Sequence, residues 1–169
     1  MTEHSEGFSH IDHDGGRARS RMVDVGAKST TRRTATARAR VVFPPGVLER
    51  VLAGDGPKGP IEEVARVAGI LAAKRTAELI PMCHPLGLDH VEVQFEPHGP
   101  DTLDVVCQAA LDGKTGVEME GLVGATLAAL TVYDMTKALD KGIRIESIEL
   151  LEKTGGKSGT WRKAANPTE

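Results

Sequence analysis

Aromatic residues are scarce in this 169-residue chain, which contains three Phe, one Trp and one Tyr. Proteins that bind RNA on a β-sheet stack bases on aromatic side chains of the central strands. The segment 102–110, which we predict to be such a strand, contains no aromatic residue. The formal net charge of −3 gives no general attraction for a phosphate backbone either. Both features argue against nucleic-acid binding.

Cysteine and long hydrophobic runs are also rare. The two cysteines, Cys83 and Cys107, form no C-x-x-C pair, so no disulfide framework is predicted and a reducing cytoplasm is expected. The histidines are scattered without metal-ligand spacing, so we predict no metal site. No apolar run is long enough to cross a bilayer and no signal peptide is recognisable, so we expect a soluble protein.

Acidic residues are nearly absent from one stretch close to the N-terminus. Between Arg17 and Arg40, seven arginines and Lys28 face a single acid, Asp24, which gives a local charge of +7. Residues 1–33 lack a periodic apolar pattern, so we predict a flexible basic arm. Such an arm suits phosphate ligands, although a solvated charged arm is the alternative.

Hydrophobic periodicity divides the remainder into strands and helices. The predicted order is strand, helix, strand, strand, helix and strand, at 34–42, 60–79, 90–96, 102–110, 114–141 and 143–150. This order predicts an α+β domain over 34–152 with the ferredoxin-like split β-α-β arrangement, a four-stranded antiparallel sheet with two helices on one face. A Gly- and Lys-rich tail, 153–169, follows.

The second predicted helix carries an unusual stripe. Its apolar residues recur at steps of three and four, at Met119, Val123, Leu127 and Leu130. The same stripe continues through Glu120, Asp134, Lys137 and Lys141, so we predict that the Asp134–Lys137 pair faces the protein interior. An ion pair that fixes helix docking and an acid/base pair are both consistent with this pattern. Glu120 and Asp134 lie roughly 21 Å apart along a straight helix, so one site includes both only with a long ligand or a second subunit.

His84 is the notable residue of the loop after the first predicted helix. It follows Cys83 between Pro81 and Pro85. Adjacent residues of an extended segment point to opposite sides, so a Cys83–His84 nucleophile–base dyad is geometrically poor. His84 is better suited to donate a hydrogen bond or carry a proton, and a hydrogen-bonded loop histidine is the structural alternative.

Lysines concentrate in predicted loops and at helix ends. The tail from Lys153 to Gly159 lacks the first glycine of a phosphate-binding P-loop, but a Gly/Ser/Lys segment can still wrap an anion, or can simply be solvated. With the basic arm, these lysines favour a polyanionic small molecule as ligand: Lys28, Lys58, Lys114, Lys137, Lys153 and Lys157. A ligand-sensing regulatory module of the same fold is the non-enzyme alternative.

Five segments of the chain closely resemble the MoaC family, the cyclic pyranopterin monophosphate synthases of molybdenum cofactor biosynthesis. The resemblance extends from about residue 16 to 161. It is carried by MVDVGAK (22–28), KGPIEEVARVAGILAAKRTAELIPMCHPL (58–86), GKTGVEMEGL (113–122), ALTVYDMTKAL (129–139) and TGGKSG (154–159).

This resemblance implies a fold, an assembly and a reaction. The expected fold is ferredoxin-like, assembled as a hexamer (a trimer of dimers) with active sites at subunit contacts. The expected reaction is that of a lyase, which converts 3',8-cyclo-7,8-dihydroguanosine 5'-triphosphate, made by an upstream radical enzyme, into cyclic pyranopterin monophosphate and pyrophosphate. No cofactor is implied for this step.

The resemblance also assigns roles by position. Asp134 is the implied acid/base residue and Lys137 its partner, with Lys58 and His84 in the same catalytic site. The implied substrate-lining residues are Met82, Cys83, His84, Met119 and Glu120. The implied phosphate-binding residues are Lys28, Arg19, Lys153 and Lys157. Because Ser20-Arg21 interrupt the usual motif of the arm, Arg17 and Arg21 remain alternatives to Arg19.

Overall fold

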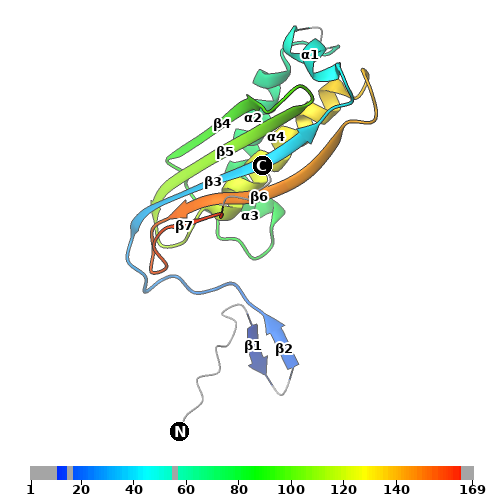
Figure 1. Cartoon of the computed structure of the whole chain (residues 1–169). Coiled ribbons are helices and arrows are strands. Elements are labelled where there is room, and N and C mark those ends of the chain that lie inside the picture. The colour runs from blue at the N-terminus through cyan, green and yellow to red at the C-terminus, as the bar shows by residue number, and fades with distance from the viewer. Residues whose placement is uncertain (1–10, 15–16, 55–56, 165–169) are drawn as a thin grey trace.

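A computed structural model describes residues 11–14, 17–54 and 57–164 of the chain. Its centre is a five-stranded antiparallel sheet with two long helices, α2 (Ile61–Lys74) and α4 (Glu118–Thr136), packed on one face (Figure 1). No helix in the described residues is long and apolar enough to cross a bilayer.

The main elements follow one another in the predicted order of strand, helix, strand, strand, helix and strand, and further short elements are added to it. The described helices are α1 (Val47–Leu52), α2 (Ile61–Lys74), α3 (Thr76–Leu79) and α4 (Glu118–Thr136). The strands of the sheet are β3 (Thr31–Val42), β4 (His90–Pro97), β5 (Thr102–Gly113), β6 (Arg144–Thr154) and β7 (Trp161–Arg162), in the spatial order β4-β5-β3-β6-β7. A separate hairpin, β1 (Ile11–Asp14) and β2 (Arg17–Ser20), extends away from the sheet in Figure 1.

The α+β class is confirmed, but the predicted sheet of four strands is wrong. The short strand β7 pairs with β6 through Glu152–Arg162 and Lys153–Trp161, so part of the predicted tail belongs to the sheet. β3 begins at Thr31, within the predicted arm, and β6 continues to Thr154. A two-residue strand has too few residues to show an alternating pattern, which explains why periodicity missed β7.

The first predicted helix is divided in two. α2 ends at Lys74, Arg75 leaves the helical conformation, and α3 adds a further turn. The buried Thr76 donates a hydrogen bond from its hydroxyl to the carbonyl oxygen of Ala73 at 2.9 Å. Because Ser and Thr side chains can bond nearby carbonyls in place of the backbone N–H, they favour such helix interruptions.

Small residues bring the helices close to each other and to the sheet. Ala35, Ala37 and Ala39 of β3 are fully buried under α4. Where α2 crosses α4, a Cβ at Gly69 would lie 2.9 Å from the carbonyl oxygen of Gly124, so only glycine fits there. The inward face of α4 is accordingly built of Gly121, Gly124, Ala125, Ala128, Ala129 and Val132.

The stripe predicted to face inward on α4 therefore faces outward at its C-terminal half. Leu130 is 49% exposed, and the side chains of Asp134 and Lys137 are 54% and 49% exposed. The prediction of an inward-facing Asp134–Lys137 pair is wrong for the single chain. The helix buries its small residues to permit close backbone packing, and its larger apolar residues are left on the other side.

Candidate active site

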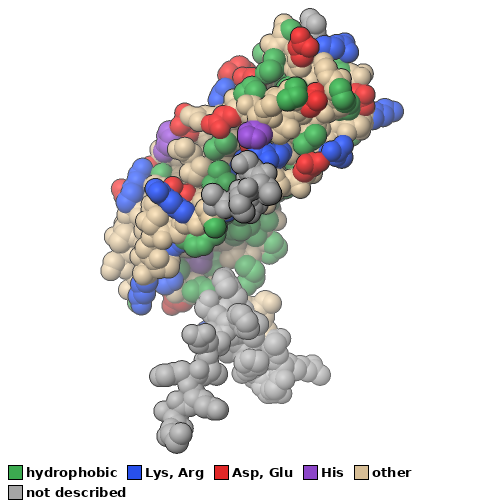
Figure 2. Space-filling view, in the orientation of Figure 1, with side chains coloured by type: hydrophobic (Ala, Val, Ile, Leu, Met, Phe, Trp, Pro, Cys, Tyr) green, Lys and Arg blue, Asp and Glu red, His purple; other side chains and the backbone are tan. Residues whose placement is uncertain are grey.

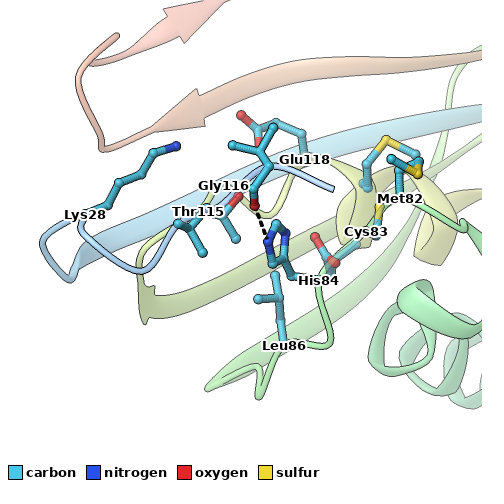
Figure 3. Close-up of a pocket in the computed structure, with 12 residues that line it drawn as sticks. Lys28, Met82, Cys83, His84, Leu86, Thr115, Gly116 and Glu118 are labelled. Atoms are coloured by element: carbon cyan, nitrogen blue, oxygen red, sulfur yellow. Dashed lines mark hydrogen bonds between the residues drawn. The ribbon is translucent and has the colours of Figure 1, made fainter. Parts of the chain in front are cut away.

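A cavity of about 270 Å³ lies at the N-terminal end of α4 (Figure 3). Three segments far apart in sequence form it: the chain leading into β3, the loop after α3, and the start of α4. Its lining residues are Val23, Val25, Lys28, Met82, Cys83, His84, Leu86, Thr115, Gly116, Glu118, Met119 and Glu120. The structure thus brings together six of the predicted residues, namely Lys28, Met82, Cys83, His84, Met119 and Glu120.

Glu120 is a buried acid that lines this cavity. It is only 3% exposed, and burial, with a smaller effect from the nearby Glu118, raises its pKa to about 7. Glu120 also lines a neighbouring cavity of about 260 Å³ beneath the Pro85–Gly87 segment. A carboxyl group in this environment can hold or release a proton near neutral pH.

A hydrogen bond from His84 holds the segment before β3 beside the cavity. Its Nε2 lies 2.8 Å from the carbonyl oxygen of Val23, so Nε2 must carry the proton and donate it (Figure 3). Lys114 donates from Nζ to the carbonyl oxygen of Gly26 at 2.7 Å and holds the same segment further along. These two bonds hold the segment that contributes Val23, Val25 and Lys28 to the lining of the cavity.

Cys83 lines the cavity as a thiol. Burial, and then the charge of Glu120, raise the pKa of Cys83 above its ordinary value. A thiolate is the nucleophilic form of cysteine, so this environment opposes nucleophilic chemistry. Cys107 is buried in the core, where burial raises its pKa to about 12.

A second cluster lies at the C-terminal end of α4. The Asp134 carboxylate accepts a bond from Lys58 Nζ to Oδ2 and an ion pair from Lys137 Nζ to Oδ1, each at 2.7 Å. The bonds to Lys137 and then Lys58 lower the pKa of Asp134 to about 2, and Asp134 in turn raises the pKa of Lys137. Asp134 is therefore a carboxylate between two ammonium groups at neutral pH.

The two clusters do not meet within one chain. Glu120 lies in the first turn of α4 and Asp134 in the last, roughly 21 Å apart along a straight helix. The structure brings together Lys58, Asp134 and Lys137, but it does not bring His84 beside them. The prediction that all four share a site is therefore not met within a single copy.

Of the predicted phosphate-binding residues, only Lys28 lines the cavity; Arg19, Lys153 and Lys157 are not among its lining residues. Lys153 bonds Ser158 Oγ and donates to the carbonyl oxygen of Gly159 at 3.0 Å, which closes the tail into a loop. Lys157 is exposed on that loop, and Arg19 is exposed on β2. Arg21, directly after β2, is exposed as well, and the side chain of Arg17 lies outside the described part of the chain.

Sequence reasoning missed several residues that line the cavity. Val23, Val25, Leu86, Thr115, Gly116 and Glu118 were not predicted as lining residues. Thr115 and Gly116 follow the Gly113-Lys114 turn directly before α4, and chain segments at helix N-termini often form binding sites. That turn was the one sequence feature that could have indicated these lining residues. The missed apolar lining residues have no sequence feature that distinguishes them from core residues.

The fold and these two clusters define an α+β protein with a candidate enzyme site for a small charged molecule. One part is a cavity with a cation, a histidine and a buried acid, and the other is a carboxylate between two lysines. In the part of the chain that the structure describes, no three His, Cys, Asp or Glu side chains are arranged to hold a metal ion.

Comparison with known proteins identifies the family. The model of the MoaC family matches residues 22–156. The chain is 52% identical over 155 residues to the cyclic pyranopterin monophosphate synthase of Desulforapulum autotrophicum, covering 91% of this chain and 93% of that protein. It is 51% identical over 155 residues to the protein of that name from Listeria monocytogenes serotype 4a, covering 92% and 97%. The chain belongs to the MoaC family.

Proposed function

We propose that this protein is a cyclic pyranopterin monophosphate synthase, a lyase of molybdenum cofactor biosynthesis. It converts 3',8-cyclo-7,8-dihydroguanosine 5'-triphosphate into cyclic pyranopterin monophosphate and pyrophosphate. The observation that carries the proposal is the Asp134 carboxylate held at 2.7 Å by both Lys58 and Lys137, inside the region that matches the family. A reaction that opens one ring, builds another and closes a cyclic phosphate needs several proton transfers.

The charge of the Asp134 cluster supports this chemistry. One carboxylate and two ammonium groups leave a net charge of +1, which attracts an anionic substrate. When substrate phosphates compete for Lys58 or Lys137, Asp134 loses stabilising bonds and its pKa rises from about 2. Asp134 then becomes a stronger base, and the lysine beside it can supply or stabilise the transferred proton.

The separation of the clusters supports a shared site between subunits. We place the Asp134 cluster of one copy against the His84 and Glu120 cavity of another, in a hexamer built as a trimer of dimers. Apolar residues are exposed on the outer faces of α2 and α4, at Val64, Val67, Leu71 and Leu130. Such surfaces are typical of subunit interfaces, and Leu130 lies one turn before Asp134.

The proposed core is ferredoxin-like. The element order β3-α2-β4-β5-α4-β6, with the spatial order β4-β5-β3-β6, is that of a split β-α-β sheet, and β7 extends it at one edge. The domain would extend from β3, which begins at Thr31, to β7, which ends at Arg162, and the basic arm would precede it. We propose that the enzyme acts in the cytoplasm, without a metal or other cofactor.

The direct test is to supply the cyclised nucleotide triphosphate made by the upstream radical enzyme. We expect the full chain to release a pterin and pyrophosphate in equal amounts. The two products are measured together, by fluorescence after oxidation and by a coupled pyrophosphate assay. Nucleotide binding without release of either product would contradict the proposal and would favour a sensing module.

A further inference from the structure

The outer edge of β6 has a stretch of backbone without a strand partner. In the order β4-β5-β3-β6-β7, the short strand β7 pairs with β6 at Glu152 and Lys153. One further backbone bond joins Lys163 N to the carbonyl oxygen of Leu151 at 2.8 Å. Within the described residues, no strand pairs with the outer side of β6 over 144–150. An unpaired strand edge can accept an added strand.

The opposite edge strand, β4, is covered by a side chain. Arg66 of α2 donates a hydrogen bond from Nη1 to the carbonyl oxygen of Val93. The Cζ of Arg66 also lies 5.2 Å from the centre of the Phe95 ring. Charged side chains over an edge strand discourage pairing with another chain. The β6 edge is therefore the better site for an added strand.

Apolar side chains accompany the free edge on the helix side of the sheet. Ile148 lies opposite the buried Ala39, so it points to the face that α4 covers, yet it is 47% exposed. Leu130 of α4, which packs against β6 as well as β3 and β5, is 49% exposed. Exposed apolar side chains along an unpaired edge are typical of a surface that another chain covers.

The free edge carries opposite charges near its two ends on the open face of the sheet. Acidic and basic side chains are interspersed on this face (Figure 2). Arg144 and Glu149 lie opposite Val42 and Arg38, whose side chains alternate with the buried residues of β3, so both point to the open face. Arg144 is 63% exposed. A positive and a negative end suit pairing with an antiparallel copy of the same strand.

A second copy of β6 is complementary to the first in one two-fold register. An axis between residues 146 and 147 places Arg144 opposite Glu149 of the second copy. The same axis places Ile145 opposite Ile148 of the second copy. Directly opposite residues must point to the same face, and the register with β3 puts the charged pair on the open face and the apolar pair on the helix side. Each pair forms twice, by symmetry.

The direction of α4 decides which parts of the two copies this pairing brings together. Val117, directly before α4, packs in one cluster with Leu150 near the C-terminal end of β6. α4 ends at Thr136, and a short turn leads to the start of β6 at Arg144. α4 therefore runs alongside β6 in the opposite direction.

The pairing consequently places the two ends of α4 side by side across the axis. β6 of one copy starts opposite Glu149 of the other, so the end of α4 with Asp134 faces the end with Glu120. Three strand spacings of about 4.8 Å separate the two β3 strands by about 14 Å. The helices packed over β3 and β6 leave space between them for apolar side chains such as Leu130 and Ile148.

We propose that the β6 edge is a self-complementary docking surface for a second copy of this chain, and that the two sheets join there into one. Each copy then gives its Asp134 cluster to one shared site and its Glu120 cavity to the other. That the shared site is the active site rests on the proposed function, whereas the pairing of the strands does not.

The first test is disulfide cross-linking of the full chain. Ile145→Cys and Ile148→Cys are combined in one variant, oxidised with diamide, and examined on a non-reducing gel and by mass spectrometry. This variant should form a covalent dimer, because Cβ atoms of directly opposite residues lie about 4.5–5.5 Å apart before local adjustment. No covalent dimer joined through residues 145 and 148 would overturn the pairing.

The single variants Ile145→Cys and Ile148→Cys are the matched controls. Equivalent residues of the two copies lie three positions, roughly 10 Å, apart along the strands, beyond the reach of a disulfide. Each single variant should therefore give no more dimer than the unchanged protein, which accounts for the native Cys83 and Cys107. Yields equal to that of the double variant would overturn the register.

The second test is dissociation. Ile148→Asp places a charge in the apolar pair and should halve the molar mass measured by light scattering, while circular dichroism stays unchanged because Ile148 is exposed in the single chain. Leu52→Asp is the matched control, since Leu52 is 48% exposed on α1. It should keep the parent mass. An unchanged mass in Ile148→Asp, or equal dissociation in Leu52→Asp, would contradict the docking surface.

Turnover separates this proposal from the proposed function. In an active enzyme, Ile148→Asp should lower turnover at least about tenfold, because no single copy contains both halves of the shared site. A protein that cross-links as predicted but forms no pterin would refute the proposed function and leave the docking surface intact. A protein that forms pterin but does not cross-link would refute the docking surface alone.

Discussion

The two ends of α4 carry acids in opposite environments. Glu120 is 3% exposed, and its pKa is raised to about 7 by burial. Asp134 is 54% exposed, and its pKa is lowered to about 2 by Lys137 and Lys58. One helix therefore presents an acid that can hold a proton at neutral pH and another that is fully ionised. Groups whose environments separate their pKa values in this way are typical of acid/base sites.

The largest expected effect comes from removing the ionised acid. Asp134→Asn keeps the size of the side chain but removes the proton acceptor, so turnover should fall about 10²-fold or more. Release of pterin and pyrophosphate under saturating substrate measures it. Because Asp134 is exposed in the single chain, the thermal unfolding of the isolated subunit should change little. Near-normal turnover would reduce Asp134 to a structural residue.

The lysines that hold Asp134 should give the next largest effect. Lys58→Ala or Lys137→Ala removes one of the two bonds at 2.7 Å, and each should slow turnover at least about tenfold. Lys141→Ala is the matched control, since this exposed lysine follows the helix without contacting the carboxylate. A folded Lys137→Ala variant with full activity, or an equal loss in Lys141→Ala, would contradict the assigned role.

A smaller effect should appear in the pH dependence of stability. The pKa of Glu120 is raised from 4.5 to about 7 in the folded chain, so the folded state binds the proton more tightly. The contribution of Glu120 to stability should therefore be greatest below pH 4.5, fall as pH rises to about 7, and then level off, by at most on the order of 3 kcal/mol. Glu120→Gln should remove this contribution, as measured by urea unfolding at several pH values. An identical pH profile in the variant would refute the raised pKa.

The smallest effect is expected from the N-terminal arm. Deletion of residues 1–20 removes the β1–β2 hairpin, which lies away from the sheet, and leaves β3 intact (Figure 1). The thermal unfolding midpoint of the remaining sheet and helices should stay nearly unchanged. Failure of the shortened chain to fold would refute the arm as a separate segment.

The sequence predicted the class of fold and the order of the main elements because strand alternation and helix periodicity are local properties. It failed on the direction of the α4 stripe. Leu127 and Leu130 were expected inside, whereas Gly124 and Ala128 are buried, because close helix crossing favours small residues over large ones. The strand β7 was missed because two residues, Trp161 and Arg162, carry no periodicity.

The candidate site also has parts that could be predicted from the sequence and parts that could not. Residues within recognisable segments, such as Met82–His84 and Met119–Glu120, were predicted and do line the cavity. The contacts of His84 with Val23 and of Lys114 with Gly26 depend on long-range packing. No local pattern encodes these contacts. The same holds for Lys58, which reaches Asp134 from a loop 76 residues earlier in the chain.

The central claim is that the two ends of α4 serve one active site across two copies of the chain. Co-expression of Asp134→Asn with His84→Ala, followed by native mass spectrometry to verify mixed oligomers, tests it directly. Each variant alone should be impaired, and a mixed two-fold dimer should recover about half of the parent activity, because one of its two shared sites regains both intact halves. With random pairing about half of the dimers are mixed, so the co-expressed sample as a whole should recover roughly a quarter of the parent activity. Mixed oligomers that form but remain as inactive as the separate variants would contradict the claim.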